Sequence, residues 1–140
     1  MGSATAWHLA RRGRDVVLLE RFERGHAWGS SHGATRIFRV AYRDPLYSRL
    51  AGAALPVWRE LEAESGQVLL EQSGQLDHGD PVAIDEIEQT LRSGGWGYDR
   101  LTPEQAHERW PSMVFDTAVV FSPDGGRVFA DRTVEAQTAL

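Results

Sequence analysis

Cysteine is absent from the 140-residue sequence, which excludes disulfides, thiolate chemistry and cysteine-ligated metals within these residues. Apolar runs long enough to cross a membrane are also absent, and the N-terminus lacks the apolar stretch of a signal peptide. These absences favour a cytoplasmic protein. The net charge of −5 argues against a general nucleic-acid surface and against binding to an anionic membrane.

Several site patterns are missing as well. The five histidines are not spaced as metal ligands, so we predict no metal site. There is no Gly-x-x-x-x-Gly-Lys phosphate loop and no Gly-x-Ser-x-Gly turn, so we predict no catalytic residue. The composition itself, 41% hydrophobic and 25% charged, is typical of a globular protein with a core.

The first informative stretch predicts a helix followed by a strand. Small residues begin the helix at Gly2 and Ser3, and Gly13 suits the left-handed position that ends one. The aliphatic run 16–19 is typical of a buried parallel strand. Glu20 follows this run and lies 20 − 2 = 18 residues after Gly2. This order matches the second half of a dinucleotide-binding βαβ unit, although Gly2 could also serve only close helix packing.

The second informative stretch covers residues 29–42. Its Ser-Ser-His-Gly turn offers hydroxyls, an imidazole and backbone amides. Arg36 and Arg39 share a face if the segment is helical and diverge if it is extended. Guanidinium groups beside such a turn suit a phosphate or a carboxylate. The alternative is a solvated surface pair with ion pairs to Asp44 or Glu20.

Taken together, these motifs resemble the sarcosine oxidase and N-methyltryptophan oxidase branch of the D-amino-acid-oxidase-like flavoenzymes. The resemblance rests on Met-Gly-Ser-Ala at residues 1–4, Leu-Leu-Glu at 18–20 and Gly-Ser-Ser-His-Gly-Ala-Thr-Arg-Ile-Phe-Arg at 29–39. It continues through residues 47–66, 101–104, 109–111 and 122–126. It covers essentially the whole chain, but only about the N-terminal third of a family member.

The resemblance implies roles for individual residues. Gly2, with Ser3 beside it, would face the FAD pyrophosphate at the helix N-terminus. Glu20 would bind the adenosine ribose, with Arg21 beside the adenine. Arg39 would pair with the carboxylate of the amino-acid substrate. The loop along the flavin would contain Ser30, His32, Thr35 and Arg36.

The implied activity is FAD-dependent oxidation of a secondary or tertiary amine in an N-methyl or imino amino acid. Electrons would pass to molecular oxygen and give hydrogen peroxide. Because the first strand and first two glycines of the motif would precede Met1, we expect an incomplete, inactive fragment that binds FAD weakly or not at all. The alternatives are a fragment of an NAD(P)-dependent dehydrogenase and a non-catalytic truncated gene product.

The expected fold is α/β: a partial Rossmann-like FAD-binding domain without its first strand, joined to the start of a mixed-sheet substrate domain. Residues 1–69 and 127–140 would belong to the FAD-binding domain and residues 70–126 to the substrate domain. Apolar periodicity predicts helices at 44–65 and 81–92, and a capping box predicts a short one after Thr102. We expect neighbouring strands at 68–71 and 74–78, further strands at 118–121 and 127–129, and a last helix capped by Asp131.

Overall fold

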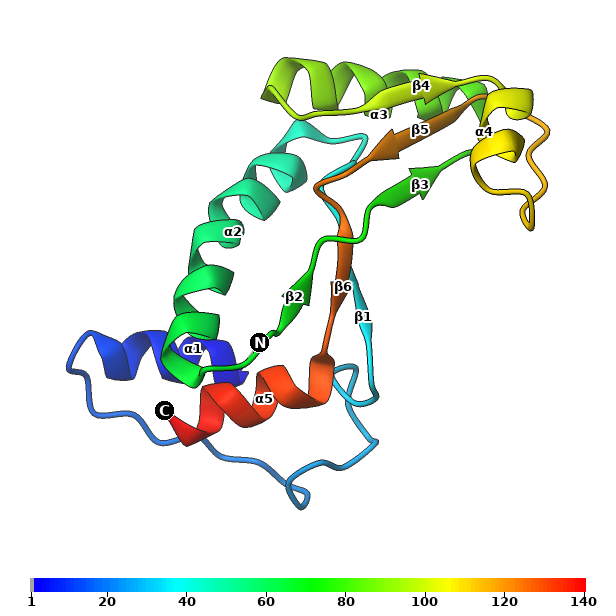
Figure 1. Cartoon of the computed structure of the whole chain (residues 1–140). Helices are drawn as coiled ribbons and strands as arrows, with labels where there is room; N and C mark the ends of the chain where they lie inside the picture. The colour runs from blue at the N-terminus through cyan, green and yellow to red at the C-terminus, as the bar shows by residue number, and fades with distance from the viewer. Residues whose placement is uncertain (1) are drawn as a thin grey trace. The chain divides into compact units, whose positions relative to one another are not determined.

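The computed structural model describes residues 2–140, and the described chain folds as two compact units (Figure 1). Unit 1 contains residues up to Arg36, then Pro56–Glu71 and Arg127–Leu140. Unit 2 contains Ile37–Leu55 and Gln72–Gly126. Helices and strands alternate along the chain, so the α/β class is confirmed. None of the helices between residues 2 and 140 has the length and apolar character needed to cross a membrane.

The predicted helices all form, and their ends follow the expected local chemistry. The Asp44 carboxylate accepts a hydrogen bond from the Leu46 amide, and Gly66 adopts a φ of 67° just after the helix that Asp44 begins. Thr102 and Gln105 form the reciprocal capping box. The helices are α1 (Gly2–Arg11), α2 (Pro45–Ser65), α3 (Pro81–Gly94), α4 (Pro103–Arg109) and α5 (Ala130–Ala139).

The strands form two three-stranded sheets in the described part of the chain, with orders β1-β6-β2 and β3-β5-β4. Their bounds are β1 (Arg36–Phe38), β2 (Leu70–Glu71), β3 (Gln75–Asp77), β4 (Asp99–Leu101), β5 (Val119–Ser122) and β6 (Gly126–Val128). The prediction that 68–71 and 74–78 are neighbouring strands is wrong. β2 pairs antiparallel with β6, and β3 pairs antiparallel with β5, because Gly74, at a φ of 90°, separates the two strands. Strand β4 was not predicted.

The core of unit 1 forms where α1, α2 and α5 meet. Trp7, Leu61, Leu69 and Ala136 are buried together, with Trp58 packed against them. Figure 1 shows α1 beside α5, and the Ser3 hydroxyl donates to the Gln137 side chain over 2.8 Å.

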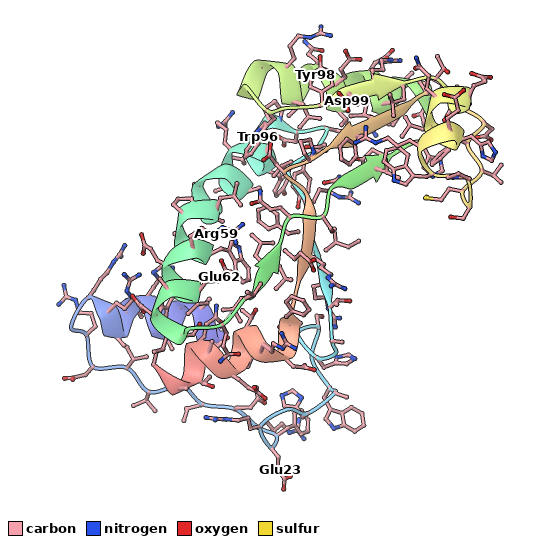
Figure 2. The ribbon with its side chains drawn as sticks, in the orientation of Figure 1. Glu23, Arg59, Glu62, Trp96, Tyr98 and Asp99 are labelled. Carbon is pink, nitrogen blue, oxygen red and sulfur yellow. The ribbon has the colours of Figure 1, made fainter. Side chains whose placement is uncertain are left out.

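A carboxylate from α2 fixes the chain that leads into β2. Glu62 Oε1 accepts the backbone amides of Leu69 and Leu70 at 2.8 and 2.9 Å. Arg59 pairs with Glu62 at 2.6 Å and also donates to the Leu70 carbonyl. Figure 2 shows both labelled side chains extending from α2 toward β2.

Two local predictions in unit 1 are wrong. Residues 16–19 form no strand, because no strand among the described residues lies beside them to supply hydrogen-bond partners. Val17 and Leu19 are 82% and 87% exposed. Asp131 does not cap α5: Phe129 holds the N-cap position. The Asp131 carboxylate instead accepts the Gly33 amide at 2.9 Å.

Unit 2 has its own core, in which Ala106, Phe115 and Val119 are buried with Leu76, Leu101 and Trp110 packed around them. On the α3 side, Glu88 collects hydrogen bonds from Arg92, Tyr98 and Arg100. Asp99, labelled in Figure 2, begins β4, and Tyr98 directly precedes it, so this network ties β4 to α3.

Candidate functional site

A cleft of about 650 Å³ opens in unit 1. Its walls are α1 from Gly2 to Ala10, the irregular segment that follows α1, and α5. It gathers four of the residues that the sequence predicted as cofactor ligands: Gly2, Ser3, Glu20 and His32. The cleft also has an apolar wall, formed by Val16, Leu18 and Leu19.

The N-terminus of α1 meets the cleft at Gly2 and Ser3. The first amides of a helix have no partner within the helix and carry a partial positive charge, which suits an anion. A side chain at Gly2 would have its Cβ 3.4 Å from Leu18 Cδ1. This is an ordinary van der Waals distance, so the start of the helix lies within contact range of the 16–19 segment.

Glu20 is held by its own loop. One carboxylate oxygen accepts the amides of Arg21 and Phe22 at 2.7 and 3.1 Å, and the other lies 3.4 Å from His26 Nε2. The hydrogen bond from Phe22, followed by that from Arg21 and the contact with His26, lowers the pKa of Glu20. Glu20 is thus an ionised acceptor at neutral pH, oriented beside the cleft.

The loop after the cleft is fixed by Arg36. Its Nε donates to the Ser30 carbonyl and its Nη1 to the Thr35 carbonyl, each at 2.7 Å. His32 lines the cleft, and its Nδ1 contacts the Gly29 carbonyl. The other predicted cofactor ligands do not line the cleft: Arg21, Ser30, Thr35 and Arg36. Arg36 therefore shapes the loop that presents His32.

Arg39 lies in unit 2. Arg39 directly follows β1 (Arg36–Phe38), so this segment is extended and not helical. The Arg39 guanidinium is exposed and lies 6.0 Å from the centre of the Tyr42 ring, and the Tyr42 ring lies 5.6 Å from that of Tyr47. Within residues 2–140, neither arginine makes the ion pair with Asp44 or Glu20 that the alternative interpretation expected.

Sequence reasoning missed residues that join the site through folding. Asp131, Glu135 and Gln137 of α5 line the cleft. In unit 2, burial raises the pKa of Asp77, and the charge of Arg39 offsets this in part. No cofactor motif marks the α5 positions, because only the packing of α5 within unit 1 brings them to the cleft. Across residues 2–140, no group of three or more His, Asp or Glu side chains could hold a metal ion.

Comparison with known proteins shows the family of the chain. The family model for FAD dependent oxidoreductases matches residues 1–140, and the chain belongs to this family. Within the family it is similar to sarcosine oxidases, as the sequence motifs predicted. It is 34% identical over 139 residues to the peroxisomal sarcosine oxidase of Mus musculus, covering 96% of this chain and 36% of that relative.

Two further likenesses support this placement. The monomeric sarcosine oxidase of a Bacillus species (strain B-0618) is 29% identical over 146 residues, covering 100% of this chain and 37% of that protein. The open form of NikD, an amino acid oxidase essential for nikkomycin biosynthesis, superposes with a TM-score of 0.76 at 27% identity. That match covers 98% of this chain and 37% of NikD. The chain thus spans a little over a third of the length of these relatives.

FAD is the cofactor of this family, and the cleft residues fit part of it. A helix N-terminus with Gly2 and Ser3 suits a pyrophosphate. The oriented carboxylate of Glu20 suits the hydroxyls of a ribose. Both features line one cleft, so the residues present fit the adenosine diphosphate half of the cofactor.

Proposed function

We propose that this chain supplies the adenosine-binding part and the substrate-carboxylate anchor of an FAD-dependent amine oxidase of the sarcosine oxidase type. The substrate class is an N-methyl or imino amino acid, oxidised at a secondary or tertiary amine. The observation that carries the proposal is the shared cleft of Gly2, Ser3, Glu20 and His32 in a chain that matches the family throughout.

Each residue has a distinct part in the proposed activity. The α1 N-terminus, Gly2 and Ser3, holds the pyrophosphate by backbone amides. Glu20 accepts hydrogen bonds from the adenosine ribose, and Arg21, next to it, contacts the adenine. The loop of Ser30, His32, Thr35 and Arg36 lies along the flavin. Bound FAD supplies the electron acceptor for amine oxidation, with molecular oxygen as final acceptor and hydrogen peroxide as product.

Arg39 is proposed to bind the substrate carboxylate. It is exposed, so a ligand can reach it, and Tyr42 borders it. A guanidinium donates two parallel hydrogen bonds to a carboxylate, which fix the orientation of the amino acid and contribute to its affinity. This part of the proposal is independent of the cofactor cleft.

The cofactor part is tested by NMR titration of the 140-residue chain with FAD, with NADH as the competing candidate. We expect weak binding of FAD, with shifts confined to α1, residues 16–32 and α5. Glu20→Gln should weaken it, because the ribose loses an ionised acceptor. Glu23→Gln is the matched control: Figure 2 shows Glu23 pointing away from its unit, and it does not line the cleft. Equal weakening by both variants, or a preference for NADH, would contradict the proposal.

A further inference from the structure

Residues 20–28 form a closed turn beside the cleft in unit 1. The His26 amide donates to the Glu23 carbonyl at 3.2 Å, and Gly25, between them, adopts a φ of 81°. The turn brings the imidazole back to Glu20, so that His26 Nε2 lies 3.4 Å from Glu20 Oε2. Both side chains line the cleft, but sequence motifs mark only Glu20.

The backbone decides which nitrogen of His26 carries the proton. The Trp28 amide donates to His26 Nδ1 at 3.1 Å. A backbone N–H can only donate, so Nδ1 must be the unprotonated acceptor. The single proton of the neutral ring is therefore on Nε2. The nitrogen next to Glu20 is thus a donor, matched to a carboxylate oxygen.

Aromatic contacts hold the imidazole in place. The Phe22 ring lies 5.1 Å from the His26 ring and 5.9 Å from the Trp28 ring, centre to centre. The His26 side chain is only 21% exposed. The packing of the ring and the hydrogen bond at Nδ1 together fix where Nε2 lies.

The contacts of Glu20 differ between its two carboxylate oxygens. Oε1 accepts the amides of Arg21 and Phe22, which occupy both of its lone pairs. Oε2 has His26 as its partner in the described chain and keeps one lone pair. The Glu20 side chain is 54% exposed, so a ligand can reach this oxygen. A ribose hydroxyl would therefore donate to Oε2, the oxygen beside His26.

We propose that His26 is a positioning residue, whose Nε2–H orients Oε2 of Glu20 to accept one ribose hydroxyl of the cofactor. The proposal rests on the proposed function in one respect, the role of Glu20 as acceptor for the adenosine ribose. His26 acts through Glu20 and need not touch the ligand. A carboxylate that is oriented in advance spares the ligand the entropic cost of ordering it.

The arrangement is tested first without a ligand, by NMR of the 140-residue chain at alkaline pH, where histidines are neutral. Long-range proton–nitrogen spectra should show His26 protonated at Nε2 alone. His107 is the internal control. Its Nδ1 contacts the Met113 carbonyl at 3.2 Å, which can only accept, so His107 should be protonated at Nδ1. A proton on Nδ1 of His26 would overturn the proposal.

Two amide side chains separate the donor of His26 from its acceptor. By side-chain length, asparagine places its polar atoms near the position of Nδ1, and glutamine places them near that of Nε2. His26→Asn keeps an acceptor for the Trp28 amide and loses the donor to Glu20. It should weaken FAD binding about fivefold, the value of one hydrogen bond. His26→Gln keeps the donor and should retain most of the affinity. Equal losses in the two variants would contradict the role of the donor.

A double variant tests whether His26 acts through Glu20. In a Glu20→Gln background, His26→Asn should cause no further loss of FAD affinity, because the ionised acceptor that it orients is gone. Inorganic pyrophosphate, which contacts only α1 in the proposed site, should bind all variants equally. Additive losses, or an equal loss for pyrophosphate, would mean that His26 supports the loop as a whole, against the proposal.

The outcomes separate this inference from the function on which it rests. Weaker FAD binding in Glu20→Gln but not in His26→Asn would overturn the role of His26 alone. Binding unchanged in both variants would overturn the role of Glu20 and that of His26 with it. Absence of FAD binding to the unaltered chain would overturn both roles, while the ligand-free spectra would still report which nitrogen faces Glu20 as a donor.

Discussion

Glu62 stabilises unit 1 by holding two backbone amides and one guanidinium. Burial raises its pKa, but the amide of Leu70, the Arg59 side chain and the amide of Leu69 outweigh this and lower it below the ordinary 4.5. The ionised form therefore stabilises the fold above pH 4.5, and this contribution is lost as pH falls through the lowered pKa.

Glu62→Gln should accordingly lower the free energy of unfolding by about 1–3 kcal/mol at pH 7, because the buried amides lose a charged acceptor. Urea denaturation at pH 7 measures this free energy. Repeated at lower pH down to 3, it should show a shrinking difference between the unfolding free energies of Glu62→Gln and the unaltered chain. Glu60→Gln is the control, since Glu60 is half exposed and pairs only with Arg11 in the described chain. Equal losses in both variants would show that the amide contacts add nothing.

Asp77 should act in the opposite direction on stability. Its pKa is raised above the ordinary 3.8, first by burial, so between these two values the folded chain binds more protons than the unfolded chain. Stability therefore falls as pH rises from about 3.8 through the raised pKa and stays lower above it. Asp77→Asn should be more stable than the unaltered chain at pH 7 and lack this decline. Thermal unfolding as a function of pH measures it, and a destabilised Asp77→Asn would contradict the burial argument.

At the scale of residues, the sequence predicts those site members that belong to a motif. Gly2 marks a helix start, Glu20 follows a strand-like run, and His32 belongs to a small-residue turn. All three line one cleft. Asp77 and Gln137 have no such marker, because their places follow from which strands pair and which helices pack. The roles of the motif residues in binding stay predictions.

At the scale of elements, the chain connection from β2 to β3, which belong to different sheets, depends on a glycine. Gly74 adopts a φ of 90°, and a Cβ there would lie 2.4 Å from the Phe121 ring. Its amide also donates to the Gly125 carbonyl at 2.9 Å. Both the backbone conformation and the close ring therefore exclude a side chain.

Gly74→Ala should destabilise the chain by about 2–5 kcal/mol, the sum of left-handed strain and overpacking. Gly79→Ala is the matched control. Gly79 also has a positive φ, 120°, but a Cβ there would meet nothing within 4 Å. Gly79→Ala should therefore lower the free energy of unfolding only by the cost of the strained backbone conformation. The difference between the two variants in urea denaturation isolates the clash with Phe121. Equal losses would mean that the ring moves aside without cost.

Helices were easier to predict than strands for a physical reason. Each helix carries its hydrogen bonds within its own sequence, so periodicity and caps such as Asp44 and Thr102 predict it. A strand needs a partner. Residues 16–19 have the composition of a strand but no neighbouring strand in the described chain, and they stay irregular. The pairing of β2 with β6 likewise depends on residues more than fifty positions apart.

At the scale of the molecule, the two units have separate apolar cores. One is centred on Trp7, Leu61 and Leu69, and the other on Ala106, Phe115 and Val119. The proposed cofactor cleft lies wholly in unit 1, and Arg39 with Asp77 lies in unit 2. The predicted division into domains at 1–69, 70–126 and 127–140 stays a prediction. Separate cores let each unit hold its own part of the proposed site.

Separate cores also predict separate losses of stability. Leu61 is 2% exposed, and Leu61→Ala should cost about 2–5 kcal/mol through lost burial and a cavity. Amide hydrogen exchange should then accelerate in α1 and α5, with little change in β3 and β5. Phe115→Ala should give the reverse pattern, and Leu46→Ala, at a half-exposed position, should change neither. If Leu61→Ala and Phe115→Ala each lower protection equally throughout both units, the chain unfolds as one cooperative body, and the two cores do not stabilise their units separately.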